Sequence, residues 1–299
     1  MKKLRFLVSL TTRDNDDQVE QAAAAQDASR RLGADLEILY AENDAITQST
    51  QILKAVQVAP ESRPDAIVFE PVGATALPQV ARTAVAAGIC WAVLNREAEY
   101  LPELRKTSRI PIFSISSDHK EIGRIQGQQF AAMLPRGGSI LYIQGPSENS
   151  AAKDRTEGMH SALPPKVQVT ALRGQWTEES ASKSISSWLR LNLAHKRGID
   201  LIGAQNDAMA IGARKSFEDV TNLAERGQWL RLPYTGVDGL PKTGQTWVRT
   251  GKLKATVLVP PNAGQAIAMI GEAMKTGSGV PERSYTVPSS FPALENLVR

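Results

Sequence analysis

The chain has 299 residues, of which 42% are hydrophobic and 22% are charged, and this length and composition predict a globular protein of two domains. Its formal net charge is +4, but the Lys and Arg residues are scattered, without a run of five or more or interleaved aromatic residues, which argues against nucleic acid as a partner. The one cysteine, Cys90, excludes an internal disulfide, and together with only three histidines it argues against a metal site.

The first third of the chain alternates short apolar runs with helical patterns. The apolar runs predict strands at residues 4–10, 36–40, 66–69 and 90–94. Helical patterns lie between them at residues 18–32, 47–59 and 77–87, and Gly33 and Gly88 end two of these helices. Repeated strand–helix units predict a parallel sheet with right-handed crossovers and with both faces covered.

Lys2 and Lys3 precede the first predicted strand and resemble the positively charged N-terminal region of a signal peptide. Residues 4–10 nevertheless contain Arg5, and no small-residue cleavage site follows them. We therefore read this segment as a strand and expect that a leader was either removed or never present. No apolar stretch reaches the length that a bilayer crossing needs.

A second series of strands and helices begins near residue 110. Apolar runs predict strands at residues 112–115, 140–143, 167–172, 201–204 and 255–259, and a further strand is predicted to end at Asp238 in the segment 234–239. Helical patterns lie at residues 121–134, 151–163 and 178–193, after residue 207, up to about residue 250, and after Pro260-Pro261. Two such series predict an α/β protein of two doubly wound parallel-sheet lobes, with a deep crevice between facing strand ends.

The stretch at residues 201–213 is a strand that runs directly into an Ala-rich helix. Asn206 and Asp207 lie at this junction, and both are good helix N-caps. Ligands of open α/β sheets bind at the carboxyl ends of strands, so the two side chains are placed to face a crevice. The alternative is that both residues only cap the helix.

Motifs of nucleotide and acyl-transfer enzymes are absent. There is no Gly-x-Ser-x-Gly elbow, and no Gly-x-Gly-x-x-Gly follows the first strand. Residues 239–244 have the glycine spacing of a phosphate loop, but Gln245 stands where its lysine would be. No pair of carboxylates offers a plausible acid and base for a sugar-acting enzyme. We therefore predict no catalytic residue, no metal and no cofactor.

Polar and aromatic residues instead follow the predicted strands. An arginine donates to two hydroxyl oxygens, Asp accepts from hydroxyls, Asn does both, and an indole face covers the C–H side of a sugar ring. This set of side chains suits a neutral polyhydroxylated ligand. The alternatives are a structural salt bridge for each arginine and a core position for the tryptophan. The residues are Asn95, Arg96, Asn149, Arg155, Trp176, Asn206 and Asp238.

Short motifs lie along nearly the whole chain in a consistent order. They are residues 65–71, residues 87–96, Ser117-Asp118 with Gly123 and Gly127, Gly145 with Arg155 and Gly158, residues 204–213, and residues 236–239. In order and spacing they resemble the type I periplasmic sugar-binding proteins, the ribose-binding and galactose-binding group. The effector domain of lactose-repressor-type regulators shares that two-lobed fold.

By position, the resemblance implies that Arg96, Arg155, Asn206 and Asp238 contact a sugar and that Trp176 covers its ring. Three departures argue against ribose itself. Asn95 stands where the ribose-binding pattern has aspartate, Val259 replaces a glutamine near the hinge, and an acidic run that includes Asp16 replaces an aromatic pair. The predicted ligand contacts are Asn95, Arg96, Asn149, Arg155, Trp176, Asn206, Asp238 and Asp16.

The resemblance also implies that the chain crosses three times between the lobes through a hinge. We expect an N-terminal lobe of residues 1–115 and 260–287 and a C-terminal lobe of residues 116–259 and 288–299. A ligand that bridges the two lobes would favour their closed form.

The function implied is that of a solute-binding protein. It would capture a sugar or polyol between its lobes and present it to the membrane subunits of an ABC transporter, without acting as an enzyme. We expect a monomer in the periplasm that binds no nucleic acid. The alternative is the effector-sensing domain of a lactose-repressor-type regulator that lacks its DNA-binding headpiece, located in the cytoplasm.

Overall fold

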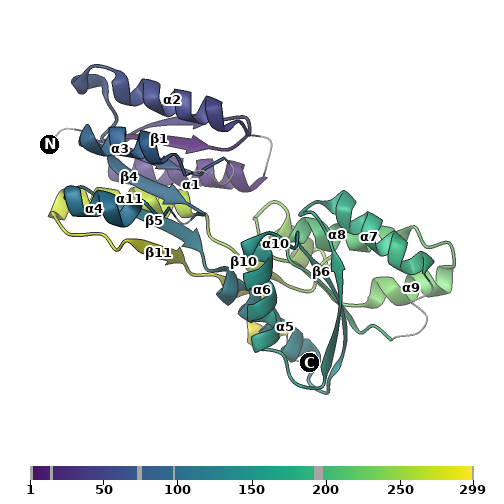
Figure 1. Cartoon of the computed structure of the whole chain (residues 1–299). Helices are drawn as coiled ribbons and strands as arrows, with labels where there is room; N and C mark the ends of the chain where they lie inside the picture. The colour runs from purple at the N-terminus through teal and green to yellow at the C-terminus, as the bar shows by residue number, and fades with distance from the viewer. Residues whose placement is uncertain (1–2, 14–15, 73–75, 97, 192–197, 298–299) are drawn as a thin grey trace. The chain divides into compact units, whose positions relative to one another are not determined.

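The computed structural model describes residues 3–13, 16–72, 76–96, 98–191 and 198–297, which divide into two compact units. Unit 1 consists of Met1–Ser117 and Pro261–Thr286, and unit 2 of Asp118–Pro260 and Val287–Arg299. The chain therefore passes from one unit to the other after residues 117, 260 and 286. Figure 1 shows the helices and strands of each unit along the chain.

Unit 1 contains a six-stranded sheet in the order β11-β5-β4-β3-β1-β2, and all five strand pairings are parallel. Because parallel strands joined by helices share one direction, their carboxyl ends all lie along one edge. The strands are β1 (Arg5–Leu10), β2 (Asp35–Tyr40), β3 (Ala66–Phe69), β4 (Cys90–Leu94), β5 (Ile112–Ser117) and β11 (Arg283–Thr286).

Helices cover both faces of this sheet. On one face, Phe6 and Val8 pack with Ala25 and Ile267, which belong to α1 (Asp16–Leu32) and α11 (Asn262–Thr276). On the other face, Leu7 packs with side chains of three further helices. These are α2 (Ala45–Gln57), α3 (Pro78–Ala86) and α4 (Leu101–Thr107).

Unit 2 contains a four-stranded parallel sheet in the order β7-β6-β8-β9 and an antiparallel pair, β10 with β12. The strands are β6 (Gly138–Gln144), β7 (Val167–Arg173), β8 (Leu201–Ala204), β9 (Tyr234–Thr235), β10 (Thr256–Leu258) and β12 (Ser289–Phe291). The helices are α5 (His119–Met133), α6 (Ser150–Ser161), α7 (Glu178–Arg190), α8 (Asp207–Glu218), α9 (Leu223–Arg231) and α10 (Gly244–Arg249).

The helices of unit 2 also form two layers. Phe130 of α5 and Met159 of α6 pack on one face of the sheet, whereas Ile185 of α7 and Met209 of α8 pack on the other. Helices α5 and α6 touch through their backbones, since a Cβ on Gly158 would lie 1.9 Å from the carbonyl oxygen of Lys120. This close crossing fixes the position of α6.

The two-lobed α/β fold with parallel sheets predicted from the sequence is confirmed. Helices α4 and α9 and strands β11 and β12 were not predicted from the sequence. The helix predicted at residues 178–193 extends to Arg190, and its last two predicted positions lie outside the described residues. Among the residues that the structure describes, no helix is both long and apolar enough to cross a lipid bilayer.

Candidate functional site

The carboxyl edge of the sheet in unit 1 carries polar side chains centred on Glu70. Glu70 follows β3 directly, and its Oε2 accepts a hydrogen bond of 2.8 Å from Nε2 of Gln18. The same nitrogen lies 3.2 Å from Oδ2 of Asp17, and Oε1 of Gln18 accepts from the backbone N–H of Thr11 at 2.9 Å. The first turn of α1 therefore holds an amide and a second carboxylate against the end of β3.

Glu70 is partly buried, and its pKa is raised from 4.5 to about 7. Burial is the main cause, because it disfavours the charged form, and the neighbouring Asp17 carboxylate adds to the effect. Hydrogen bonds from Gln18 and Asn95 and the charge of Arg96 oppose the shift. The Glu70 carboxyl therefore exchanges a proton near neutral pH.

Asn95 and Arg96, both predicted ligand contacts, follow β4 and reach this group. Asn95 has a left-handed backbone (φ 56), and its Oδ1 accepts a 2.6 Å hydrogen bond from Nδ2 of Asn262, the first residue of α11. Arg96 is exposed and forms no ion pair with another described residue. Asp16, also a predicted contact, is exposed at the start of α1 and makes no described hydrogen bond to Glu70.

In unit 2, Arg155 brings three predicted ligand contacts together. Its side chain is buried, Nη1 donates to the carbonyl of Gln205, and the same nitrogen lies 3.8 Å from Oδ1 of Asp238. The guanidinium carbon stands 5.5 Å from the centroid of the Trp176 ring. Its Nε is buried and has no hydrogen-bond partner among the described residues. The Arg155 guanidinium, the Asp238 carboxylate and the Trp176 indole therefore lie next to one another.

Arg155 lies within the helix predicted at residues 151–163, whereas Asp238 lies beyond the strand end expected of it. Arg155 is in the middle of α6 and reaches the sheet edge only through its long side chain. Asp238 lies three residues beyond the end of β9, in a loop where its backbone has φ 106 and pairs with Leu258. Trp176 does follow β7, and its indole lies over Gly145, where a Cβ would come within 2.3 Å of the ring.

The two predicted asparagines of unit 2 are both helix N-caps. Oδ1 of Asn206 accepts from the N–H of Met209 at 2.8 Å, and its Nδ2 donates to the carbonyl of Trp176 at 2.9 Å. Oδ1 of Asn149 accepts from the N–H of Ala152 at 3.3 Å. Asn206 therefore also fixes Trp176, whereas the described hydrogen bond of Asn149 is only a cap.

Asp207 does not cap α8, although its residue type favoured that role. Its Oδ2 accepts from the N–H of Gly239 at 2.8 Å, and its Oδ1 accepts from the hydroxyl of Thr256 at 2.7 Å. Burial raises the pKa of the Asp207 carboxyl, and the adjacent Asp238 carboxylate raises it further. Asp207 therefore ties the loop that carries Asp238 to β10.

Sequence reasoning missed several residues that build these two groups. Gln205 links β8 to α6, because Oε1 accepts from the N–H of Gly145 and Nε2 donates to Ala152 and Thr156. Glu70 was visible only as the residue that ends a strand, although its strand-end position is the signal that identified Asn95. Gln18 lies in the first turn of α1, and Asn262 is the first residue of α11. Both are far from β3 in sequence, so no local pattern indicates their contacts.

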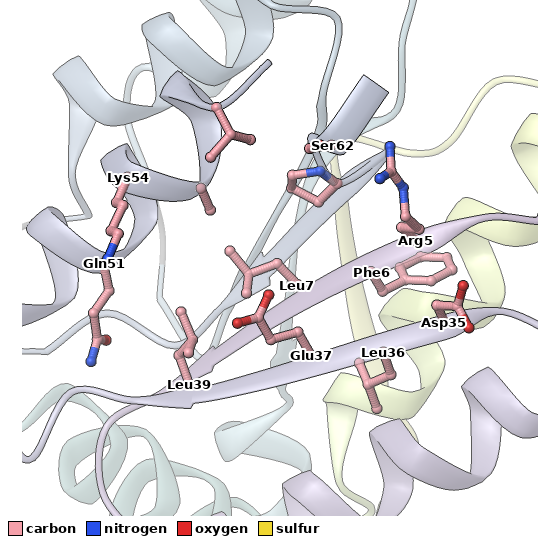
Figure 2. Close-up of a pocket in the computed structure, with 13 residues that line it drawn as sticks. Arg5, Phe6, Leu7, Asp35, Leu36, Glu37, Leu39, Gln51, Lys54 and Ser62 are labelled. Carbon is pink, nitrogen blue, oxygen red and sulfur yellow. The ribbon is translucent and has the colours of Figure 1, made fainter. Parts of the chain in front are cut away.

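A cavity of about 530 Å³ lies elsewhere in unit 1. Figure 2 shows Gln51 and Lys54 extending from α2 on one side, with Leu7 and Leu39 from β1 and β2 on the other. None of the predicted ligand contacts lines it. Within the described residues, no three His, Cys, Asp or Glu side chains are grouped so that they could hold a metal ion.

A family described as "Periplasmic binding protein domain" matches residues 6–278 of the chain. The chain is 26% identical over 262 residues to the ribose import binding protein RbsB of Salmonella typhimurium, a match that covers 88% of this chain and 81% of the relative. It is 28% identical over 269 residues to the xylitol-binding protein of Mycolicibacterium smegmatis, which covers 86% of this chain and 70% of the relative.

Solved structures show the same fold. One of them is a periplasmic solute-binding protein of an ABC transporter from Actinobacillus succinogenes, with bound D-allose. It matches with a TM-score of 0.79 and 20% identity, and the match covers 98% of this chain and 100% of that chain. The Caulobacter myo-inositol binding protein, bound to myo-inositol, matches with a TM-score of 0.72 and 20% identity over 98% of this chain and 94% of that one.

Proposed function

The chain belongs to the periplasmic binding protein family, and from that premise we propose that it captures a sugar or a related polyol and delivers it to the membrane subunits of an ABC transporter. The names of its relatives support this proposal, since they describe proteins that bind ribose for import, xylitol, D-allose and myo-inositol. These relatives favour transport over the alternative of a regulator's sensor domain.

The single observation in this chain that carries the proposal is the group formed by Arg155, Asp238 and Trp176. A planar guanidinium donates two parallel hydrogen bonds to adjacent hydroxyls, and a nearby carboxylate accepts from another. An indole face packs on the C–H side of a sugar ring. Each hydrogen bond to a charged group contributes roughly 1.5–3 kcal/mol net, so a few of them supply the ~8 kcal/mol of a micromolar site.

We further propose that the protein binds its ligand without transforming it and works as a monomer in the periplasm. The relatives named above are described as binding proteins rather than enzymes. The family is described as a periplasmic binding protein domain, and the Actinobacillus succinogenes protein as periplasmic. That the ligand takes groups from both lobes stays a prediction. Light scattering on the eluting peak of a size-exclusion column checks the monomer with and without sugar.

A thermal-shift screen tests the function. Isothermal titration calorimetry then measures the affinity of every compound that raises the melting temperature. The screen contains pentoses, hexoses, polyols and sugar acids, with nucleotides, amino acids and acyl esters as controls. A carbohydrate at 100 times its dissociation constant should add about 2.7 kcal/mol to the free energy of unfolding, because it binds only the folded chain. Stabilisation by nucleotides or acyl esters alone would contradict the proposal.

A further inference from the structure

The side chain of Gln205 joins three elements of unit 2. Gln205 follows β8 directly and is 0% exposed. Its Oε1 accepts from the N–H of Gly145, just after β6, at 2.8 Å. Its Nε2 donates to the carbonyl of Ala152 and to the hydroxyl of Thr156 in α6, both at 2.9 Å. Because the side chain is buried and its Nε2 already donates to two acceptors, it acts on its neighbours and not on a ligand.

The two contacts in α6 lie on either side of Arg155 in the sequence. Ala152, Arg155 and Thr156 stand at positions i, i+3 and i+4, so they share one face of the helix. The Gln205 amide therefore holds the face of α6 from which the Arg155 side chain extends. The guanidinium returns to the same residue, because Nη1 of Arg155 donates to the backbone carbonyl of Gln205. Gln205 thus holds Arg155 at both ends.

The third contact connects this arrangement to the indole of Trp176. The ring lies over Gly145, where a Cβ would come within 2.3 Å of it. The guanidinium carbon of Arg155 stands 5.5 Å from the ring centroid. One amide therefore contacts both the backbone beneath the indole and the helix that carries the guanidinium. The position of Arg155 beside Trp176 depends on Gln205.

We propose that Gln205 is a positioning residue of the carbohydrate site: it holds the Arg155 guanidinium beside the Trp176 indole without touching the ligand. This inference rests on the proposed sugar-binding function and adds to it a residue that acts through Arg155. Hydrogen bonds weaken steeply when their distance or angle departs from the preferred range. A side chain that is already ordered also loses less entropy on binding. Loss of the amide should therefore lower affinity although both ligand groups are still present.

Helix α6 should stay in place when the amide is removed. A Cβ on Gly123 would lie 2.0 Å from the carbonyl oxygen of Arg155, and one on Gly158 would lie 1.9 Å from a carbonyl oxygen of α5. These backbone contacts between α5 and α6 do not involve Gln205. Gln205→Met keeps the length of the side chain but removes the amide. We expect a folded variant of lower stability, because the N–H of Gly145 loses this acceptor.

The first test compares Gln205→Met with a matched control by calorimetry, using the carbohydrate that binds tightest in the thermal-shift screen. Gln205→Met should weaken binding at least about fivefold. The control is Gln129→Met: Gln129 is also 0% exposed, and its Nε2 donates to the carbonyl of Thr256 at 2.8 Å and to the hydroxyl of Ser290 at 2.9 Å. It should lower stability in urea but change affinity less than about twofold, since its described hydrogen bonds reach no proposed ligand group.

The second test asks whether Gln205 acts through Arg155. In an Arg155→Ala chain there is no guanidinium to position, so adding Gln205→Met should weaken binding by no more than about twofold. A purely structural role would weaken binding by the same factor in both backgrounds. Circular dichroism confirms that each single and double variant is folded.

Thr156 provides an independent pair of variants that applies even where Gln205→Met does not fold. Thr156→Val removes the hydroxyl that accepts from Gln205 and should weaken binding at least about threefold. Thr156→Ser keeps the hydroxyl and should stay within about twofold of the wild type. Equal affinities in the two variants would overturn the inference.

The outcomes separate this inference from the proposed function. If the wild type binds a carbohydrate and Gln205→Met binds it equally well, the positioning role fails and the sugar-binding function stands. The same holds if Gln129→Met weakens binding as much as Gln205→Met. If the wild type binds no carbohydrate, both proposals fail.

Discussion

Arg155 combines burial with an unfinished set of hydrogen bonds. Nη1 donates to Gln205 and faces Asp238, while Nε has no partner among the described residues. A guanidinium held in this way is oriented before a ligand arrives, which lowers the entropic cost of binding. Lysine has the charge but not the planar fork, so it cannot reproduce the same pair of hydrogen bonds.

We therefore expect both Arg155→Lys and Arg155→Ala to weaken binding of the best carbohydrate by at least about tenfold, since a hydrogen bond to a charged group contributes roughly 1.5–3 kcal/mol. Calorimetry measures the affinity, and circular dichroism measures the fold. Arg124→Ala is the matched control, because Arg124 forms an exposed i,i+3 pair with Glu121 and should be neutral. Loss of the fold together with binding would make Arg155 a structural residue instead.

Glu70 should also make the stability of the chain depend on pH. Its pKa is about 7 in the folded chain, whereas the ordinary value for a solvated glutamate, as in the unfolded chain, is 4.5. The folded form therefore binds the proton more tightly than the unfolded form. The free energy of unfolding should therefore fall as the pH rises from about 4.5 to about 7, by up to about 3 kcal/mol, and then level off.

Urea unfolding of the wild type and of Glu70→Gln at pH 4.5, 6, 7 and 8 measures this effect. The quantity to compare is the difference between the two chains at each pH, which removes the titration of all other groups. Wild-type stability should decline relative to the variant over this range. Parallel profiles would show that Glu70 is not a buried titrating group.

For single residues, the sequence predicted which side chains build the site better than it predicted what those side chains contact. Arg155, Trp176 and Asp238 were named from residue type and order, and the structure brings them together. Asp207 was expected to act as a cap, yet it bonds Gly239 and Thr256, which is 49 residues away in sequence. Such long-range contacts leave no local pattern, so residue type alone could not predict them.

Among the elements, the loop between β9 and α10 is held by close packing around the Asp207 carboxylate. A Cβ on Gly236 would lie 2.1 Å from its Oδ1, and one on Gly244 would lie 2.0 Å from its Oδ2. The two glycines therefore leave room for a buried carboxylate. Because this loop carries Asp238, the packing also determines where that side chain stands.

Gly244→Ala should destabilise the chain by about 1–3 kcal/mol, the usual cost of overpacking a filled interior. It should also weaken carbohydrate binding, because the displaced carboxylate no longer holds Gly239 and its neighbour Asp238. Gly227→Ala in α9 is the control: its Cβ meets nothing closer than 3.8 Å, so it should be neutral or stabilising by up to about 1 kcal/mol. Equal effects in both variants, measured by urea unfolding, would contradict this account.

The elements that the sequence predicted are those with a strong pattern. Strands β3 and β4 were predicted with their observed ends, because each is a short, fully buried apolar run. Helix α4 has only seven residues and buries Leu101 and Leu104 alone, too little for a helical stripe. Strands β11 and β12 are partly exposed edge strands, whose alternation is weak.

For the whole molecule, the important feature is that neither unit is made from one continuous segment. Unit 1 needs residues 261–286 as well as residues 1–117. Helix α11 provides Ala263, Ala266, Ile267 and Ile270 to one face of its sheet. The backbone N–H of Ala263 also donates to Gln21 of α1.

A chain that ends at residue 260 should therefore fail to protect residues 3–117 from limited proteolysis, because one face of the sheet loses four buried side chains. Adding a separately produced peptide of residues 261–299 should restore protection. Mass spectrometry of the fragments identifies the sites that become accessible. Full protection without the peptide would mean that the first 117 residues fold independently.

The divided unit also sets the order in which the protein can mature on the ribosome. The first 117 residues leave the exit tunnel before α11 has been translated, and at about 5–20 residues per second the ribosome takes roughly 7–30 s to add residues 118–260. During that interval the side of the nascent sheet that carries Phe6, Val8 and Leu10 has no α11 to cover it. The nascent polypeptide therefore exposes a hydrophobic surface that chaperones can bind until α11 has been synthesised.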